Sequence, residues 1–217
     1  MKICNIITLD NVDSTNSYVK RNKITAGTCV RALCQSAGRG RLGRSFLSPA
    51  GGLYFSVVLN CSQKQLATIA AAVAVADCIE NCLVKWPNDI LINGKKACGI
   101  LCEGNSVNDD VIIGVGINVA SSPIEGSCAV GGDAEVLFAK VLESMERVYT
   151  LLEYDSEAVI KSYEKRLATK NVTVRVNAGG KELVGMALGI DNEARLLVRI
   201  EDNVVAVNSG EATIIKE

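Results

Sequence analysis

The sequence has 217 residues, of which 48% are hydrophobic, and a net charge of −1, which suits one large domain, or a medium domain with a small appendage, around a sizeable core. This charge argues against a broad basic surface for nucleic acid, and the longest apolar run, residues 66–76, is too short to span a bilayer. Histidine is absent, which excludes an imidazole base or a histidine-ligated metal for this chain acting alone.

The N-terminus and the cysteines indicate the cellular setting. No basic region followed by a cleavable apolar segment opens the chain, so we expect a cytoplasmic protein. Nine cysteines, an odd number scattered through expected strands and helices, favour reduced side chains packed in the core. The alternative is a metal site made by Cys78, Cys82, Cys98 and Cys102. No Cys-x-x-Cys pair supports it, so the sequence favours packing.

The chain up to residue 169 predicts a sheet with packed helices. Strands are expected at residues 3–8, 28–35, 53–59, 83–86, 90–92, 95–103 and 111–119. Helices are expected after segment 13–16 to about residue 22, at 65–80, at 134–152, and at 156–168 with Ser156 as its cap. Asn93-Gly94 is the strongest hairpin signal, and the glycine- and serine-rich segment 120–133 is expected to be a connection.

The pattern changes after residue 170. Short β-type runs, separated by turn residues, lie at 172–176, 181–190, 195–200, 204–208 and 212–216. Five strands at this spacing predict a small barrel that forms its own C-terminal domain. We therefore expect two domains, at residues 1–169 and 170–217.

The segment from Cys34 to Ser56 places alternating glycines and arginines between two core strands. The glycines at 38, 40 and 43 relax the steric limits on the backbone, and the arginines at 39, 41 and 44 offer charged forks to phosphate or carboxylate oxygens. We expect a lid that is mobile when empty and ordered by an anion. Glycine-arginine segments also bind nucleic acid, but this one joins two strands and is not a tail.

Polar residues elsewhere could complete a site. Segment Asp13-Ser14-Thr15-Asn16 precedes a helix, where such residues either cap the first turn, the favoured interpretation, or hold a polar head group. Gln35 ends a strand where its amide can point into a pocket. Segment Lys85-Trp86-Pro87-Asn88-Asp89 ends another strand, and Asp89 either caps a turn or supplies an oxygen ligand for magnesium on a nucleotide.

Two further features carry less information. Strand alternation predicts that one of Lys95 and Lys96 faces solvent while the other faces the sheet. Gly114-Val115-Gly116 suggests a dinucleotide fingerprint, but Val119 stands where the third glycine belongs. The sequence therefore gives little support to a dinucleotide site.

Taken together, these motifs resemble the motif series of biotin protein ligases. The matching segments are Gly-Arg-Gly-Arg-Leu-Gly-Arg, Ser-Pro-Ala-Gly-Gly-Leu-Tyr, Lys-Trp-Pro-Asn-Asp, Lys-Ala-Cys-Gly-Ile-Leu and Gly-Val-Gly-Ile-Asn. The resemblance extends from Asp13 to the end of the chain, where Asn-Ser-Gly-Glu is similar to the family's C-terminal barrel. It implies an α+β fold of the class II synthetase-like biotin/lipoate ligase type. This fold has a mixed or antiparallel sheet with packed helices, a catalytic domain at 1–169 that binds biotin and ATP, and an SH3-like β-barrel at 170–217.

The resemblance implies an enzyme that joins biotin to ATP, releases pyrophosphate, and passes biotin from the adenylate to one lysine of a carrier domain in a biotin-dependent carboxylase. Cations must offset the repulsion between the two anionic substrates, and the catalytic residues would be Lys96, Arg39 and Arg41. The biotin-binding residues would be Ser14, Thr15, Asn16, Gln35, Gly38, Arg39, Gly40, Arg41, Lys96 and Gly99. The ATP-binding residues would be Arg39, Arg41, Arg44, Phe46, Asn88, Lys96 and Asn118, with Asp89 as a ligand for Mg²⁺.

The sequence departs from the family pattern in two places. Phe46 stands where the family usually has tryptophan, so the aromatic platform for adenine has a smaller face. No helix-turn-helix segment precedes Ile3, so we expect no DNA binding. We also expect no membrane contact, and the resemblance implies the carrier domain as partner. The resemblance leaves a homodimer open.

Three other functions fit parts of the pattern. A lipoate or octanoate ligase shares the fold and the adenylate chemistry, but the glycine-arginine loop and Lys-Trp-Pro-Asn-Asp look like the biotin branch. A nucleic-acid-binding module would use Arg39, Arg41 and Arg44, and its affinity would fall steeply with salt. A protein that only stores biotin has no need of Lys96 and Asp89.

Overall fold

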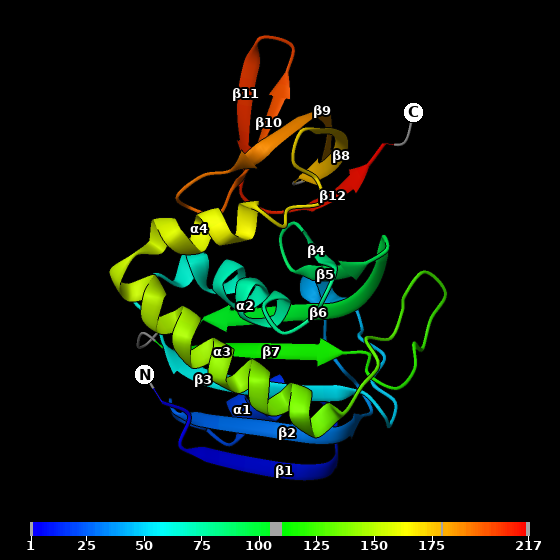
Figure 1. Ribbon diagram of the computed structural model, residues 1–217, viewed down its shortest axis with the longest axis vertical. Coiled ribbons are helices and arrows are strands. Elements are labelled where there is room, and N and C mark those ends of the chain that lie inside the picture. Colours follow the sequence, from blue (N-terminus) through cyan, green and yellow to red (C-terminus); the bar gives the residue numbers. More distant parts are fainter. Residues whose placement is uncertain (1, 105–109, 179, 216–217) are drawn as a thin grey trace.

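The computed structural model describes residues 2–104, 110–178 and 180–215, and it contains two sheets (Figure 1). The larger sheet has seven strands in the order β1-β2-β3-β7-β6-β5-β4, and the smaller has five in the order β11-β10-β9-β8-β12. The β1–β2 pair is parallel and the other neighbours in the larger sheet are antiparallel. The smaller sheet is antiparallel throughout. The predicted α+β class is therefore confirmed.

The element bounds follow the sequence pattern closely. The larger sheet consists of β1 (Asn5–Val12), β2 (Thr28–Gln35), β3 (Leu53–Asn60), β4 (Cys82–Lys85), β5 (Asp89–Ile92), β6 (Lys95–Gly104) and β7 (Asp110–Ile117). The smaller sheet consists of β8 (Val172–Ala178), β9 (Lys181–Ile190), β10 (Leu196–Ile200), β11 (Asn203–Val207) and β12 (Glu211–Ile214). The helices are α1 (Thr15–Arg21), α2 (Ala67–Ala76), α3 (Ala134–Tyr154) and α4 (Ser156–Glu164), with short 3₁₀ turns η1 (Arg41–Gly43) and η2 (Lys64–Leu66).

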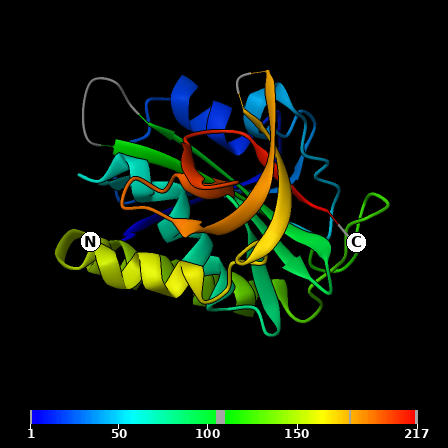
Figure 2. The ribbon, with the colours of Figure 1, turned by 90° about the horizontal axis from the view of Figure 1, so that it is seen from above.

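The larger sheet buries side chains on both faces. Helices α2, α3 and α4 cover one face, and α1 lies on the other (Figures 1 and 2). Alternation along β3 divides the core, because Val57 belongs to the cluster beneath α2 and α3 while Val58 packs with Val19 of α1. Helix α2 is buried almost all round, which explains why its sequence has no polar face. On the α1 face, a pocket lies over the sheet beside the start of this helix.

The smaller sheet is joined to the main body by buried contacts. Its core residues Val174 and Val198 belong to the same apolar cluster as the helices of the larger domain. The indole Nε1 of Trp86 donates a hydrogen bond to Ala194 O at 2.9 Å, and Glu164 Oε1 accepts from Ile190 N at 3.0 Å. The division into domains at residue 170 stays a prediction. All five expected strands are present, but residue 216 of the last one lies outside the described residues.

Some expected boundaries were wrong, for local reasons. The first strand lies at Asn5–Val12 instead of 3–8, because its parallel register with β2 continues to Val12 opposite Gln35. The helix expected at 65–80 is regular only from Ala67 to Ala76, after which the backbone bonds shorten to i, i+3 contacts. The cap of α4 is Asp155 and not Ser156, since the Asp155 carboxylate accepts from Ala158 N at 3.0 Å.

Neither a membrane span nor a disulfide is seen among the described residues. None of their helices is long and apolar enough to cross a membrane. All nine cysteines are free, and burial raises the pKa of the Cys29 and Cys102 thiols to about 12, so both stay neutral. Within the described ranges, no group of three or more metal-binding side chains is found.

Candidate active site

A pocket of about 860 Å³, open solvent included, lies beside the N-terminus of α1 on the α1 face of the larger sheet. Glycines form its floor. A Cβ added to Gly114 would overlap Asn16 Oδ1, and one added to Gly116 would lie 2.5 Å from the Phe46 ring. The strand is therefore kept free of side chains where neighbouring groups approach the backbone.

One end of the pocket, which we name the amide end, consists of Thr15, Asn16, Gln35 and Ser56. Gln35 Oε1 accepts from Thr15 N at 2.8 Å, and Gln35 Nε2 donates to Ser48 Oγ at 2.8 Å. The Ser56 hydroxyl, fully buried on β3, lies 2.6 Å from both Thr15 Oγ1 and Asn16 Oδ1. The amide end is thus a connected network of hydrogen bonds held by α1, β2 and β3.

The start of α1 serves this end of the pocket as well as the helix. Ser14 is the N-cap, with an extended backbone and a side chain that accepts from Ser17 N at 3.5 Å. Ser14, Thr15 and Asn16 are all buried and line the pocket. Ser14 therefore both caps the helix and lines the pocket, whereas the side chains of Thr15 and Asn16 line the pocket without capping.

The glycine-arginine loop is folded back as a small hairpin over the pocket. Phe46 N donates to Gly38 O at 2.8 Å, and Gly40 N donates to Arg44 O at 2.7 Å. Its tip is η1, where Leu42 and Gly43 have φ values of 54° and 74°. Gly38 does not line the pocket, because it lies in the stem of this hairpin.

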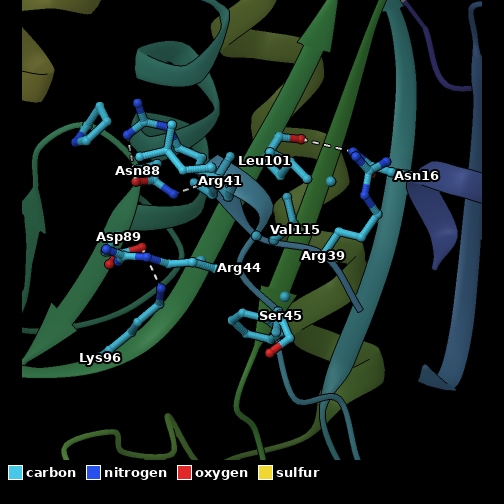
Figure 3. Close-up of a pocket in the computed structure, with 18 of the residues that line it drawn as sticks. Asn16, Arg39, Arg41, Arg44, Ser45, Asn88, Asp89, Lys96, Leu101 and Val115 are labelled. Atoms are coloured by element: carbon cyan, nitrogen blue, oxygen red, sulfur yellow. Dashed lines mark hydrogen bonds and ion pairs between the residues drawn. The ribbon is translucent and has the colours of Figure 1, made fainter. Parts of the chain in front are cut away.

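The three arginines of the loop point to different partners (Figure 3). Arg39 Nη1 lies 3.5 Å from Glu103 Oε1, on the side of Asn16. Arg41 Nη1 donates to Asn88 Oδ1 and Gly210 O, both at 3.4 Å, and burial lowers the pKa of its guanidinium although Asp89 opposes the shift. Arg44 is 64% exposed and pairs with Glu211 Oε2 at 2.7 Å. The loop thus spans the pocket from one end to the other.

The opposite end of the pocket, which we name the charged end, consists of Arg41, Arg44, Lys85, Asp89, Lys96 and Glu211. Lys96 Nζ lies 2.7 Å from Asp89 Oδ1, an ion pair that lacks the alignment of a hydrogen bond. Lys85 Nζ lies 3.5 Å from Glu211 Oε1. Lys96 also stands 5.7 Å from the centre of the Phe46 ring, and its neighbour Lys95 is exposed, as strand alternation predicts.

A second hollow, about 590 Å³ with open solvent included, adjoins the charged end. Phe46, Lys96 and Asn118 contribute to its walls, together with residues of the 120–133 connection. Asn118 Nδ2 donates to Lys96 O at 3.4 Å and Cys128 O at 3.3 Å, whereas its buried Oδ1 has no hydrogen-bond partner. An unpaired buried acceptor is costly, so this oxygen is suited to a ligand that donates an N–H.

The structure brings most of the predicted site residues together. Those that line the main pocket are Ser14, Thr15, Asn16, Gln35, Arg39, Gly40, Arg41, Arg44, Phe46, Asn88, Asp89, Lys96 and Gly99. Sequence reasoning did not assign a role to Lys85, Gly114, Gly116, Gly210 or Glu211, which line the pocket too. Glycines within a buried strand were a usable signal for the floor. Glu211 comes from the smaller sheet and ends the Asn-Ser-Gly-Glu segment that the resemblance included without giving it a role.

Asp89 is the residue at which magnesium could be held. Its carboxylate lies in the pocket, and magnesium bound to a nucleotide commonly uses one or two carboxylates together with phosphate oxygens and water. A single carboxylate therefore fits a metal that enters with a triphosphate. The same oxygen is paired with Lys96, so metal and lysine would compete for it.

Comparison with known proteins gives a consistent result. Residues 9–118 match the model of the biotin/lipoate A/B protein ligase family, and residues 170–213 match the biotin protein ligase C terminal domain. The chain is similar to the bifunctional ligase/repressor BirA of Escherichia coli, with 30% identity over 92% of this chain and 70% of that protein. It is also similar to the biotin--[acetyl-CoA-carboxylase] ligase of Paracoccus denitrificans, with 28% identity over 88% of this chain and 92% of that protein. Among solved structures, the biotin protein ligase of Aquifex aeolicus in complex with biotin and ATP superposes with a TM-score of 0.84 and 28% identity, covering 98% and 99% of the two chains.

Proposed function

Because this chain belongs to the biotin/lipoate A/B protein ligase family, we propose that its amide end holds the biotin head group while its charged end holds the triphosphate of ATP. The protein is a biotin ligase, which activates biotin with ATP and transfers it to a carboxylase. One observation supports this placement above others. Among the described residues, five cations and two carboxylates line a single pocket, in a chain whose net charge is −1.

The first step joins the two anions. A carboxylate oxygen of biotin attacks the α-phosphorus of ATP, and the bond to the leaving pyrophosphate breaks. We assign Lys96 to the carboxylate and the α-phosphate, as the family resemblance implies, because its ammonium group lies in the pocket beside Asp89. Arg41 is suited to the developing phosphate charge, since a half-buried guanidinium interacts more strongly than an exposed one. Lys96 must leave Asp89 when it binds the substrates.

The second step consumes the adenylate. The amine of the acceptor lysine attacks the acyl carbon, the bond to AMP breaks, and an amide forms. No protein nucleophile is needed, which is consistent with the absence of histidine. The glycine-arginine hairpin is placed to exclude water from the mixed anhydride until the acceptor arrives.

Magnesium would be held by Asp89 and by the phosphates. It would neutralise charge on the triphosphate and so assist departure of pyrophosphate. Asn118, with its unpaired Oδ1, is assigned to the exocyclic amine of adenine, and Phe46 to the face of the ring.

The acceptor is the biotin carrier domain of a carboxylase, as the names of the relatives imply. We further propose that the chain works without binding DNA or membranes, can form a homodimer, is cytoplasmic, and divides into domains at residue 170. Its net charge of −1 supports the first of these, since DNA affinity depends on many basic contacts.

The test is one incubation of the purified protein with labelled biotin, ATP, magnesium and a carrier domain. Label should appear on the carrier and depend on ATP. In the partial reaction, biotin should drive exchange of pyrophosphate into ATP, and lipoate should not. Exchange that prefers lipoate or octanoate would assign the chain to the other branch of its family.

A further inference from the structure

Glu103, the second-last residue of β6, lies just outside the pocket, and three side chains converge on it. Its Oε2 accepts a hydrogen bond from Asn16 Nδ2 at 2.9 Å. Its Oε1 accepts from Lys20 Nζ at 2.6 Å and lies 3.5 Å from Arg39 Nη1. Burial favours the neutral carboxyl, but the hydrogen bonds from Lys20 and Asn16 outweigh it and hold the pKa below its usual value. Glu103, whose side chain is 17% exposed, is therefore a fixed negative charge at the edge of the amide end.

The glycine-arginine hairpin is attached to the rest of the protein at both ends of the pocket. Its own backbone hydrogen bonds tie its two strands together, so it can move as one unit. At the charged end it is attached through Arg41 and Arg44. In the proposed reaction, phosphates take both of these cations from their protein partners. At the amide end the attachment is Arg39, which points toward Asn16 and away from Lys96 (Figure 3).

The attachment at the amide end can persist while ATP reacts. The partner of Arg39 is Glu103, which belongs to a strand of the larger sheet and is bonded to Asn16. Asn16 is bonded in turn to Leu101 O of the same strand, at 3.2 Å. None of these contacts involves the groups that phosphates would engage at the charged end. Arg39 is thus suited to keeping the hairpin in place when its other contacts exchange partners.

Lys20 weakens this attachment, because it occupies the same carboxylate oxygen. Its ammonium group lies at hydrogen-bond distance from Glu103 Oε1, whereas the Arg39 guanidinium stays at 3.5 Å, outside the usual range. Both groups are cations, so each repels the other at their common partner. Lys20 lies on α1 and does not line the pocket. Its removal should therefore bring Arg39 closer to Glu103 and hold the hairpin more firmly.

We infer that Glu103 is a positioning residue that latches the glycine-arginine hairpin over the pocket through Arg39, and that Lys20 limits the strength of this latch. A firm latch keeps water from the adenylate, and a limited one lets the hairpin open for the acceptor lysine. The role in retaining the adenylate rests on the proposed function. The inference gives the Arg39 side chain a partner within the protein, where the resemblance implies contacts with biotin and ATP.

Two variants should act in opposite directions. Glu103→Gln keeps an acceptor for Asn16 but removes the charge that attracts Arg39, whereas Lys20→Met removes the competing cation. Trypsin cleavage after Arg41 in the empty protein should rise about threefold in Glu103→Gln and fall about twofold in Lys20→Met, the size expected for a partly exposed ion pair. Mass spectrometry identifies the cleavage site. Release of labelled adenylate from the loaded enzyme, followed during a chase with unlabelled biotin and ATP, should change by the same factors.

The matched control is Lys161→Met. Lys161 Nζ also lies 2.6 Å from a glutamate oxygen, but on α4, over the other face of the larger sheet, so both rates should keep their wild-type values. The decisive variant combines Lys20→Met with Arg39→Met. If Lys20 acts through Arg39, this double variant should have the same two rates as Arg39→Met alone. A merely structural effect of Lys20 on α1 would persist without Arg39.

Two results would overturn the inference. One is a Lys20→Met protein in which both rates equal or exceed those of wild type. Because Lys20 is 44% exposed, this variant tests the latch even if thermal unfolding shows that Glu103→Gln does not fold. The other is an effect of Lys20→Met that is equally large with and without Arg39. If proteolysis follows the expected pattern but biotin and ATP yield no adenylate, the latch stands and the proposed function fails.

Discussion

The amide end and the charged end of the pocket differ in what a ligand must displace. At the amide end, Thr15, Asn16 and Ser56 are buried and bonded to one another, so a head group meets donors and acceptors already in place. At the charged end, Lys96 pairs with Asp89 and Arg44 pairs with Glu211, so phosphates must take these cations from protein carboxylates. One end is organised in advance, and the other exchanges partners during the reaction.

The largest expected effect comes from removing the Lys96 cation at the charged end. In Lys96→Ala, adenylate formation should fall about 10²- to 10³-fold, as when one preorganised group that stabilises transition-state charge is lost. Biotin-dependent exchange of pyrophosphate into ATP measures this step. Lys95→Ala is the control, because that neighbour is exposed and should keep near-normal exchange. Near-normal exchange in Lys96→Ala would remove Lys96 from the mechanism.

A smaller effect tests whether the amide end is as rigid as its bonding suggests. In Gly114→Ala the new Cβ overlaps Asn16 Oδ1, and Asn16 cannot move without losing bonds to Glu103 and Ser56. Biotin affinity should fall about tenfold or more, with the cost of overpacking, about 1–3 kcal/mol, appearing in stability. Gly104→Ala on β6 is the control, since among the described residues its Cβ would meet nothing nearer than Lys64 Cδ at 4.0 Å. If Gly114→Ala bound biotin with wild-type affinity, the amide end would be able to rearrange around the added methyl group.

The sequence predicted the two ends unequally. Local signals were sufficient for the hairpin at Asn93-Gly94, where both residues have positive φ, and for β2 and β9, whose bounds match. The glycine-arginine loop was found because its composition is unusual, whereas Lys96 was assigned only through the family resemblance. Ser56 and Glu103 were missed, because they lie in ordinary strands and gain their roles only from partners 40 and 87 residues away. Glu211 was missed for the same reason.

The two arginines at the charged end differ in exposure, so their replacement by alanine should raise the KM for ATP to different extents. Arg41 is half-buried and close to Asn88, so Arg41→Ala should raise the KM for ATP about tenfold or more. Arg44 is largely exposed and already paired, so Arg44→Ala should change the KM for ATP about fivefold or less. Steady-state kinetics at low and high salt separate the two, because only the exposed contact is strongly screened. Equal effects would mean that the loop rearranges when ATP binds.

The smallest expected effect is the pH dependence of the stability that the Glu103 carboxylate, next to the amide end, contributes. The folded pKa of Glu103 lies below the unfolded value of about 4.3, so the ionised carboxylate contributes to stability above that pH. This contribution is lost as pH falls through the folded pKa. The difference in Tm between wild type and Glu103→Gln should therefore be constant from pH 7 to about 5 and shrink below about 4. Glu135→Gln is the control, because it removes an exposed carboxyl whose pKa Arg31 also lowers. In about 0.5 M salt, the difference in Tm between wild type and Glu135→Gln should vanish, whereas the difference for Glu103→Gln should persist. A Glu103 difference that salt abolishes would show that this charge is solvated, and the contrast between the two ends of the pocket would then be lost.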